Sequence, residues 1–477
     1  MTADILAERT FTLDDQHAFA RLTGDANPIH VDPVAARRSL AGAPLVHGVH
    51  LLLWGLDALC RRLEPSAGLH SLRVNFEKMV PVGARVQAAL VDRKADRLRL
   101  EIRLDGRVAA VIVAGLSAPA SLSPSFRHAR MFDPVQPLAL SLADMAGLAG
   151  HVALRKEAAD LPAHFPALAL RLDKKRIAGL AAATFLVGMV CPGLHSIFRS
   201  LDLVIADGAD NDENALHFSV SSLDERFRMA RIAVSGGGWT GRVDAHVRPE
   251  PVAQPGISDI AARIDAHAFE GVRALIVGGS RGLGETLAKV LASGAAEVAI
   301  TYRIGREDAD RVAGEIRDAG GICHVLAYDV TGSDSESLQV AGFSPNQIYY
   351  MATPPIRPGS GIYSASRLAE YMAFYVDGFA RAVEATASGS EKPAIFYPST
   401  VFIEDAPTGF AEYAMAKAAG EVLCREFVAR GIVSQALVER LPRLLTDQTR
   451  TLADESFPDA VGVLVGIAVK MSAGAAR

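Results

Sequence analysis

Apolar, strand-like runs alternate with helix-like runs in the last part of the chain, and this order constrains the fold more than any other feature. The strand-like runs are 272–279, 297–303 and 323–330, and the helix-like runs between them are 284–294 and 308–320. Buried strands joined by helices pair in parallel, with helices on both faces of the sheet. The pattern therefore predicts an α/β doubly wound parallel sheet, for which we expect the domain bounds 265–477.

A glycine-rich loop, VGGSRGLG at 277–284, lies between the first of these strands and its helix. Glycines let the backbone turn tightly and approach a pyrophosphate, whose charge would face the amides at the start of the helix. The loop therefore predicts a dinucleotide site. The loop residues expected to bind the cofactor are Gly278, Ser280, Arg281, Gly282, Leu283 and Gly284.

The end of the second strand indicates which dinucleotide binds. An NAD site needs a carboxylate there for the ribose hydroxyls, whereas this chain has Arg303. Arg303 and Arg281 could together clasp a 2'-phosphate, which favours NADP(H). The alternative is that both are solvated surface arginines.

A tyrosine and a lysine follow the apolar strand at 393–401. On a helix, their four-residue spacing sets Tyr413 and Lys417 on one face. Reduction of a ketone needs a proton for the alkoxide, and a tyrosine supplies it if a neighbouring cation lowers its pKa. The hydroxyl of Ser399 or Thr400 would hold the carbonyl oxygen, and the sequence leaves both open.

Together these motifs resemble the short-chain dehydrogenase/reductase family, with its Rossmann-type fold, over roughly residues 268–477. The resemblance implies that Tyr413 is the general acid and that Lys417 binds the nicotinamide ribose. It further assigns to the cofactor site Asp329, Val330 and Ala352. Two positions depart from the family pattern, because the NAG-like segment reads MATPP at 351–355 and the usual asparagine of a proton relay is Tyr375.

Two proline-rich stretches, 118–126 and 248–259, divide the chain into thirds. The first third has helix-like runs near 14–22 and 50–63, followed by alternating strands with turn residues between them. We expect residues 1–120 to form an α+β domain in which an antiparallel sheet wraps a helix.

A polar loop in the first third carries Asp25 and His30, five residues apart. Moving water across a carbon–carbon double bond needs one group for the α-proton and another for the water, and these two could divide the tasks. The backbone amide of Gly48, at the start of the apolar helix, could face the thioester oxygen, where enolate charge develops. The alternative is a plain Asx turn beside a partly buried histidine.

The run FTLDDQHAFARLTGDANPIHVD, followed by PLVHGVH, resembles the MaoC-like (R)-specific enoyl thioester hydratases, which have a hot-dog fold. The resemblance covers about residues 5–118. It implies that Asp25 and His30 form the catalytic dyad and that Asn27 shapes the loop.

The middle third echoes the first at an offset of 148 residues, since PLVHG at 44–48 matches PGLHS at 192–196. An internal duplication is one interpretation, and chance coincidence is the other. The offset aligns Asp173 with Asp25 and Ala178 with His30, so no second dyad is visible.

We interpret residues 127–250 as a degenerate second hot-dog that helps to form the acyl tunnel, with His195 as a core histidine. The predicted fold class is an α+β double hot-dog followed by an α/β Rossmann-type doubly wound parallel sheet.

Composition narrows the partners and the compartment. A net charge of -5 gives no support to a nucleic-acid or anionic-membrane partner. Four scattered cysteines and an acidic N-terminus fit the cytoplasm and indicate no metal site. The apolar stretch 177–194 is interpreted as a buried helix that runs into a turn, rather than a membrane span. By resemblance, the chain is expected to be a homodimer.

Both predicted modules act on the same carbon of an acyl thioester carried by coenzyme A or acyl carrier protein. An NADPH-dependent ketoreductase makes a 3-hydroxyacyl thioester, and a dehydratase converts it to the 2-enoyl product. The opposite, oxidative direction stays open. Two alternatives are that the hot-dog region only binds acyl chains or dimerises, and that the nucleotide-binding domain is not catalytic.

Overall fold

The computed structural model describes residues 4–39, 41–64, 68–117, 126–206, 212–332, 338, 343–359, 361–387, 391–450 and 455–475. The first proline-rich stretch, at 118–126, therefore lies almost wholly outside the described residues. The chain divides into two compact units, Met1–Glu250 and Pro251–Arg450 with Glu455–Arg477.

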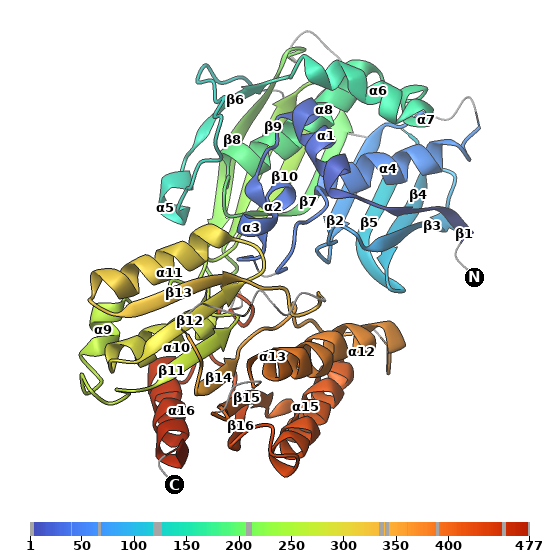
Figure 1. Cartoon of the computed structure of the whole chain (residues 1–477). Coiled ribbons are helices and arrows are strands. Elements are labelled where there is room, and N and C mark those ends of the chain that lie inside the picture. Colours follow the sequence, from blue (N-terminus) through green and yellow to red (C-terminus); the bar gives the residue numbers. More distant parts are fainter. Residues whose placement is uncertain are drawn as a thin grey trace. The chain divides into compact units, whose positions relative to one another are not determined.

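The first unit is built on one ten-stranded antiparallel sheet (Figure 1). Its strands are β1 (Asp4–Thr10), β2 (Ser71–Phe76), β3 (Arg85–Arg93), β4 (Arg97–Leu104), β5 (Arg107–Gly115), β6 (Ala149–Ala153), β7 (Ser196–Ile205), β8 (Ala215–Asp224), β9 (Met229–Gly236) and β10 (Trp239–Val247). Their order is β1-β3-β4-β5-β2-β7-β10-β9-β8-β6. The first two predicted domains thus share one sheet and one apolar core.

The two halves of this sheet repeat one topology. Each half has the order first-third-fourth-fifth-second strand, and they join where β2 pairs with β7. A long helix precedes the second strand of each half: α4 (Gly48–Cys60) in one and α8 (Lys174–Phe185) in the other. Side chains of Val49–Cys60 in α4 are all buried, as are those of Ile177–Phe185 in α8. Each half therefore wraps a sheet around a buried helix.

The predicted repeat offset of 148 residues is wrong. Equivalent strands begin at Ser71 and Ser196, at Arg107 and Trp239, or at Asp4 and Ala149, so the offset varies from 125 to 145 residues. The PLVHG segment precedes α4, whereas the PGLHS segment follows α8. The match between the two segments was therefore a coincidence. The segments stand at different places in the two halves, although the halves share one strand order.

Short helices and turns connect these elements: α1 (Leu13–Thr23), α2 (Pro28–Val31), α3 (Pro33–Ala36), α5 (Leu142–Met145), α6 (Leu161–His164), α7 (Pro166–Ala169), the 3₁₀ turn Glu157–Asp160 and the π-helical turn Leu186–Val190. Thr12 caps α1 through a capping box with Asp15. The stretch 177–194 is a buried helix that continues into the π turn, as predicted. Among the helices in the described part of the chain, none has the length and apolar character needed to cross a membrane.

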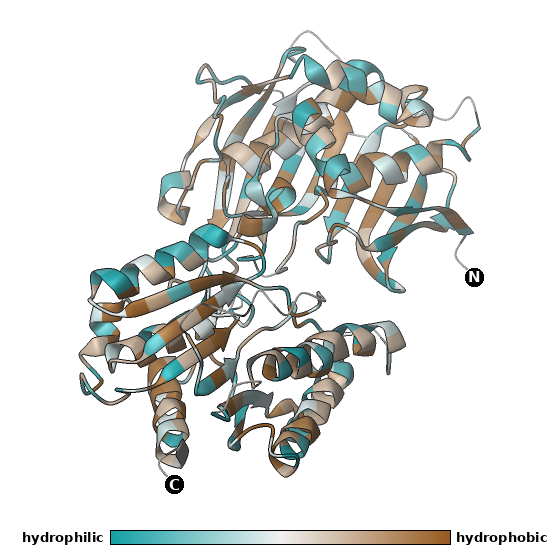
Figure 2. Ribbon diagram, in the orientation of Figure 1, coloured by the Kyte–Doolittle hydropathy of each residue, from teal (hydrophilic) through white to brown (hydrophobic). Residues whose placement is uncertain are grey.

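The second unit contains a six-stranded parallel sheet in the order β13-β12-β11-β14-β15-β16. Its strands are β11 (Arg273–Val277), β12 (Glu297–Tyr302), β13 (Ile322–Ala327), β14 (Gln347–Tyr350), β15 (Ala394–Thr400) and β16 (Gln435–Leu441). These strands carry mostly hydrophobic residues (Figure 2). The predicted α/β parallel sheet is confirmed.

Helices cover both faces of the parallel sheet. The helices of this unit are α9 (Ile257–Ala261), α10 (Gly282–Ser293), α11 (Arg306–Asp318), α12 (Ala365–Met372), α13 (Gly378–Thr386), α14 (Phe402–Asp405), α15 (Ala411–Ala429) and α16 (Ala460–Ala475), and the π-helical turn Ala373–Asp377 joins α12 to α13. One core cluster includes α10, α11 and α16, and the other includes α12, α13 and α15. The arrangement is doubly wound, as the alternation predicted.

Candidate active sites

The loop after α1 buries the Asp25 carboxyl. Helix α1 ends at Gly24, whose φ of +78° favours glycine, and the chain then turns inward. The carboxyl accepts hydrogen bonds from the Thr184 hydroxyl (2.7 Å) and from the amide of Asn27 (3.3 Å). Asp25 is 1% exposed. Burial raises the pKa of Asp25, and His30, Thr184 and the amide of Asn27 oppose this rise.

Asn27 holds the loop against the second half of the sheet. Its Nδ2 donates to the carbonyl oxygens of Gly188 (2.8 Å) and Gly193 (3.1 Å). Its Oδ1 accepts from the amide of Ile29 and so caps α2, the short helix that carries His30. Asn27 thus fixes the position of the loop, and its hydrogen-bond acceptors come from the middle third of the chain.

The tautomer of His30 follows from its contacts. Nδ1 lies 2.9 Å from the carbonyl oxygen of Leu45, which can only accept a hydrogen bond. Nδ1 therefore carries the proton in the neutral ring, and Nε2 keeps its lone pair. Burial lowers the pKa of His30, and the charge on Arg248 lowers it further, while Asp25 and the Leu45 carbonyl oppose the shift. The imidazole is a base in its neutral form.

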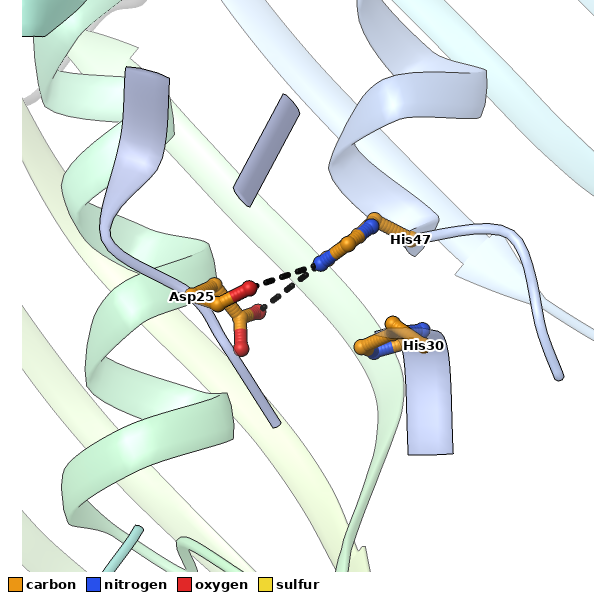
Figure 3. A group of neighbouring side chains, drawn as sticks. All are labelled: Asp25, His30 and His47. Atoms are coloured by element: carbon orange, nitrogen blue, oxygen red, sulfur yellow. Dashed lines mark hydrogen bonds and ion pairs between the residues drawn. The ribbon is translucent and has the colours of Figure 1, made fainter. Parts of the chain in front are cut away.

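His47 completes the cluster, and we did not predict it from the sequence. Its Nε2 donates to the backbone oxygen of Asp25 (3.0 Å) and lies 3.9 Å from Asp25 Oδ2 (Figure 3). Its Nδ1 faces Gln16 Oε1 at 2.9 Å. Its ring stacks on that of His30, with centroids 3.8 Å apart. The PLVHG motif was the available signal, because it brings this histidine to the start of α4.

Asp25, His30 and His47 have the residue types of a metal site, with one donor atom of each within 4.8 Å of the others. The two rings nevertheless stack at an interplanar angle of 24°. A bound metal lies close to the plane of each imidazole, about 2 Å from the nitrogen. Stacked rings cannot both meet this condition, so the arrangement suits acid–base chemistry better than metal binding.

Gly48 is the first residue of α4, so its amide has no acceptor within the helix. A Cβ at this position would lie 3.1 Å from the ring of Phe76. Asp173 and Ala178, which the wrong offset aligned with the dyad, are the N-cap and an interior residue of α8. His195 is only half-buried, rather than a core residue.

The π turn after α8 makes one prediction possible. A Cβ at Gly188 would lie 2.1 Å from Asp25 Oδ1, closer than atoms can approach. We expect Gly188→Ala to displace the Asp25 carboxyl and to lower the free energy of unfolding by about 1–3 kcal/mol. Thermal unfolding should report the loss of stability, and any activity that depends on the Asp25 carboxyl should fall as well. Gly314→Ala, in open space on α11, is the control and should leave both unchanged or stabilise the chain slightly.

The glycine loop of the second unit has the close contacts that its sequence predicts. Gly278 has a φ of +87°, and a Cβ there would lie 2.8 Å from the amide nitrogen of Ala352. A Cβ at Gly284 would lie 2.2 Å from the Gly278 carbonyl oxygen. Gly282, with a φ of +58°, opens α10, next to the half-buried Leu283. Glycine is therefore required where the loop meets the ends of the strands.

Other predicted cofactor residues surround this loop more loosely. Ser280 is buried, and Arg303 is exposed just after β12. Arg281, at the start of α10, lies 3.4 Å from the carboxylate of Asp447. Past β13, Asp329 accepts hydrogen bonds from the amide and hydroxyl of Thr331, and Val330 is buried.

The structure separates the two candidate hydroxyls at the end of β15. The Thr400 hydroxyl forms a hydrogen bond with the side chain of Tyr413. The Ser399 hydroxyl instead donates to Glu421 Oε1 at 2.5 Å. Because neighbouring residues of a strand face opposite sides, only Thr400 is placed beside the tyrosine.

Lys417 is buried, and its ammonium contacts two groups other than Tyr413. Its ammonium donates to the Pro398 carbonyl oxygen (2.6 Å) and lies 4.0 Å from the ring centroid of Tyr375. Burial lowers the pKa of Lys417 to about 7 and raises the pKa of Tyr413 to about 12, which the hydrogen bond from Thr400 opposes. Lys417 is not among the groups that shift the pKa of Tyr413, so its role in lowering that pKa stays a prediction. The Tyr375 hydroxyl bonds to Thr353, in the segment that departs from the family pattern.

Two segments of the chain match models of known protein families. Residues 2–110 match the family model of the MaoC like domain, and residues 273–344 match that of short chain dehydrogenase. The chain therefore contains a MaoC-like domain at its N-terminus and a short-chain dehydrogenase domain further along.

Individual relatives resemble only parts of the chain. A fatty acid synthase beta subunit, stcK, of Emericella nidulans is 37% identical over 103 residues, which are 21% of this chain and 5% of that relative. A short-chain dehydrogenase/reductase from Serratia marcescens has a TM-score of 0.38 and 24% identity, covering 44% of this chain and 94% of that one. A gluconate 5-dehydrogenase from Burkholderia cenocepacia, in complex with NADP and tartrate, has a TM-score of 0.40 and 23% identity, covering 44% and 92%.

Proposed function

We propose that the first unit is a double hot-dog that adds water to trans-2-enoyl thioesters and removes it from (R)-3-hydroxyacyl thioesters. The observation that carries this proposal is the buried carboxyl of Asp25 beside a half-buried His30 whose Nδ1 donates to Leu45, which leaves the Nε2 lone pair for proton transfer. A loop matching a MaoC-like domain holds the pair. The repeated strand order supports the double hot-dog.

The chemistry requires a base, an acid and a place for the thioester oxygen. In hydration, the dyad takes one proton from water, the oxygen bonds to C3, and C2 receives a proton while the double bond becomes single. The dyad then returns that proton to C2 and regains its starting state, a carboxylate beside a neutral imidazole. The backbone amide of Gly48, at the start of α4, would donate a hydrogen bond to the thioester oxygen, where the enolate charge develops.

We propose for the second unit an NADPH-dependent reductase of 3-oxoacyl thioesters. Close backbone contacts at Gly278 and Gly284 make a cradle that fits a pyrophosphate, and Arg281 and Arg303 would bind the 2'-phosphate. The dinucleotide supplies a hydride to the carbonyl carbon. Tyr413 gives its hydroxyl proton to the carbonyl oxygen, which Thr400 orients.

Both reactions change C3 of one acyl chain, so the product of reduction is the substrate of dehydration. We place the chain in fatty-acid, polyketide or related metabolism, as a cytoplasmic homodimer that takes coenzyme A or acyl carrier protein thioesters. Similarity of one segment to a fatty acid synthase subunit supports this context.

A second candidate is a hydratase whose nucleotide-binding domain does not catalyse reduction. The contacts of Lys417 favour it, because the ammonium is engaged by the Pro398 carbonyl oxygen and the ring of Tyr375. Oxidation of NADPH in the presence of a 3-oxoacyl thioester decides between the two candidates.

The direct test of the hydratase is addition of crotonyl-CoA to the full chain, with the loss of enoyl absorbance recorded. We expect hydration, and chiral analysis should find the (R)-3-hydroxy product. Absence of hydration with both coenzyme A and carrier-protein thioesters would contradict the proposal.

The hydroxyls of β15 give a matched pair of variants for the reductase. Thr400→Val should lower the rate of 3-oxoacyl thioester reduction about 10²-fold, because the carbonyl oxygen and Tyr413 lose their hydroxyl partner. Ser399→Ala should stay within a few-fold of the wild type, since Ser399 faces Glu421. The opposite order of effects would assign the role to Ser399.

A further inference from the structure

Arg248 is a buried cation that the proposed mechanism does not use. It follows β10 directly and is 7% exposed. Its amide donates to the His195 carbonyl oxygen (2.7 Å), and its Nη2 donates to the Leu194 carbonyl oxygen (2.9 Å). Within the described residues, no carboxylate forms an ion pair with it, and its Nε has no hydrogen-bond partner.

A buried guanidinium without a counter-ion is costly, because water no longer solvates its charge and no anion offsets it. Arginine stays protonated even when burial lowers its pKa, as it does for Arg248. Its field is therefore felt by nearby titratable groups, with little screening by solvent.

The acceptor of Arg248 connects it to the catalytic loop. The Leu194 carbonyl oxygen also lies 3.5 Å from Asn27 Nδ2, and Asn27 caps the helix that carries His30. Three charged or titratable groups from separate elements face His30. Asp25, from the loop after α1, raises the pKa of His30, and Arg248, from the end of β10, lowers it, while the ring of His47, from the segment before α4, stacks on the His30 ring. Of these, Arg248 carries a permanent positive charge.

We propose that Arg248 is a positioning residue for the dyad, because its buried guanidinium and the Asn27 side chain share the Leu194 carbonyl oxygen, and Asn27 caps the helix that carries His30. The inference rests on the proposed hydratase and deepens it. Asp25 by itself would favour a protonated imidazole, which has no lone pair to offer. Burial of the ring is the main cause that opposes this effect, and the charge on Arg248 adds to it, so a carboxylate and a neutral base can coexist in one site.

The test measures the protonation of His30 directly in the full chain. Diethyl pyrocarbonate acylates neutral imidazole, and peptide mass spectrometry gives the rate at His30 as a function of pH. In Arg248→Gln, which keeps a hydrogen-bond donor but loses the charge, we expect the inflection to move to higher pH by about half a unit to one unit. In an active enzyme, the acidic limb of kcat/KM should move in the same direction, because His30 would protonate at higher pH.

Two further variants separate charge from structure. Arg248→Lys keeps the charge and should keep the wild-type inflection. Arg242→Gln removes an exposed arginine from β10 and should also leave the inflection unchanged. An unshifted inflection in Arg248→Gln, or an equal shift in Arg248→Lys, would overturn the inference. Because acylation needs no substrate, a chain without hydration activity would contradict the proposed function and still allow this measurement.

Discussion

Asp25→Asn is expected to reduce hydration of a trans-2-enoyl thioester about 10³-fold, with the fold intact. Asparagine has nearly the same shape as aspartate and can still accept the Thr184 hydrogen bond, but it cannot exchange a proton with water or substrate. The loss should appear in kcat, because the replacement removes chemistry rather than binding. His30→Ala should have a similar effect, since Nε2 is the other proton-transfer group.

Asp57→Asn is the matched control for this change. Asp57 is another buried carboxylate of the first unit, on α4, and it accepts hydrogen bonds from the amides of Ala167 and Leu168. Its replacement should lower the unfolding temperature but leave hydration of the folded protein close to that of the wild type. If Asp25→Asn and His30→Ala both hydrate the thioester as fast as the wild type does, these two residues are not the catalytic dyad.

Tyr413→Phe is expected to abolish reduction of a 3-oxoacyl thioester, with a loss of about 10³-fold or more. Phenylalanine fills the same buried space but has no hydroxyl proton for the carbonyl oxygen. Burial raises the pKa of Tyr413 to about 12, so the hydroxyl is protonated and can donate throughout the neutral range. The variant should still bind NADPH, and the fluorescence of the cofactor measures this binding.

Tyr371→Phe provides the comparison, because this neighbouring buried tyrosine has its ring centroid 5.7 Å from that of Tyr413. It should keep most of the reductase activity. If Tyr413→Phe reduces the substrate as fast as the wild type does, the general acid lies elsewhere or the domain does not catalyse this reaction.

Much of the fold could be predicted because it depends on local patterns. Alternation of apolar strands and helices indicated the parallel sheet, and the single long apolar run indicated the buried α8. The symmetry of the first unit was found for the wrong reason. Its halves share strand order, which sequence comparison at one fixed offset cannot detect when loop lengths differ.

The candidate sites were predictable where their residues are close in sequence. Asp25, Asn27 and His30 lie in one loop, whereas Thr184 and Arg248 reach it only through the folded second half. The choice between Thr400 and Ser399 depended on which face of β15 each occupies. Helical spacing placed Tyr413 and Lys417 on one helix, but it could not show that the Lys417 ammonium donates to the Pro398 carbonyl oxygen.

The central claim is that one chain carries out both reduction and dehydration at C3 of an acyl thioester. Its most direct test is incubation of the full chain with NADPH and a set of 3-oxoacyl thioesters, with products identified by mass. We predict NADP formation and the enoyl product, which has lost water, alongside its 3-hydroxyacyl precursor. Recovery of the unchanged 3-oxoacyl thioesters, with no NADPH consumed, would contradict this account.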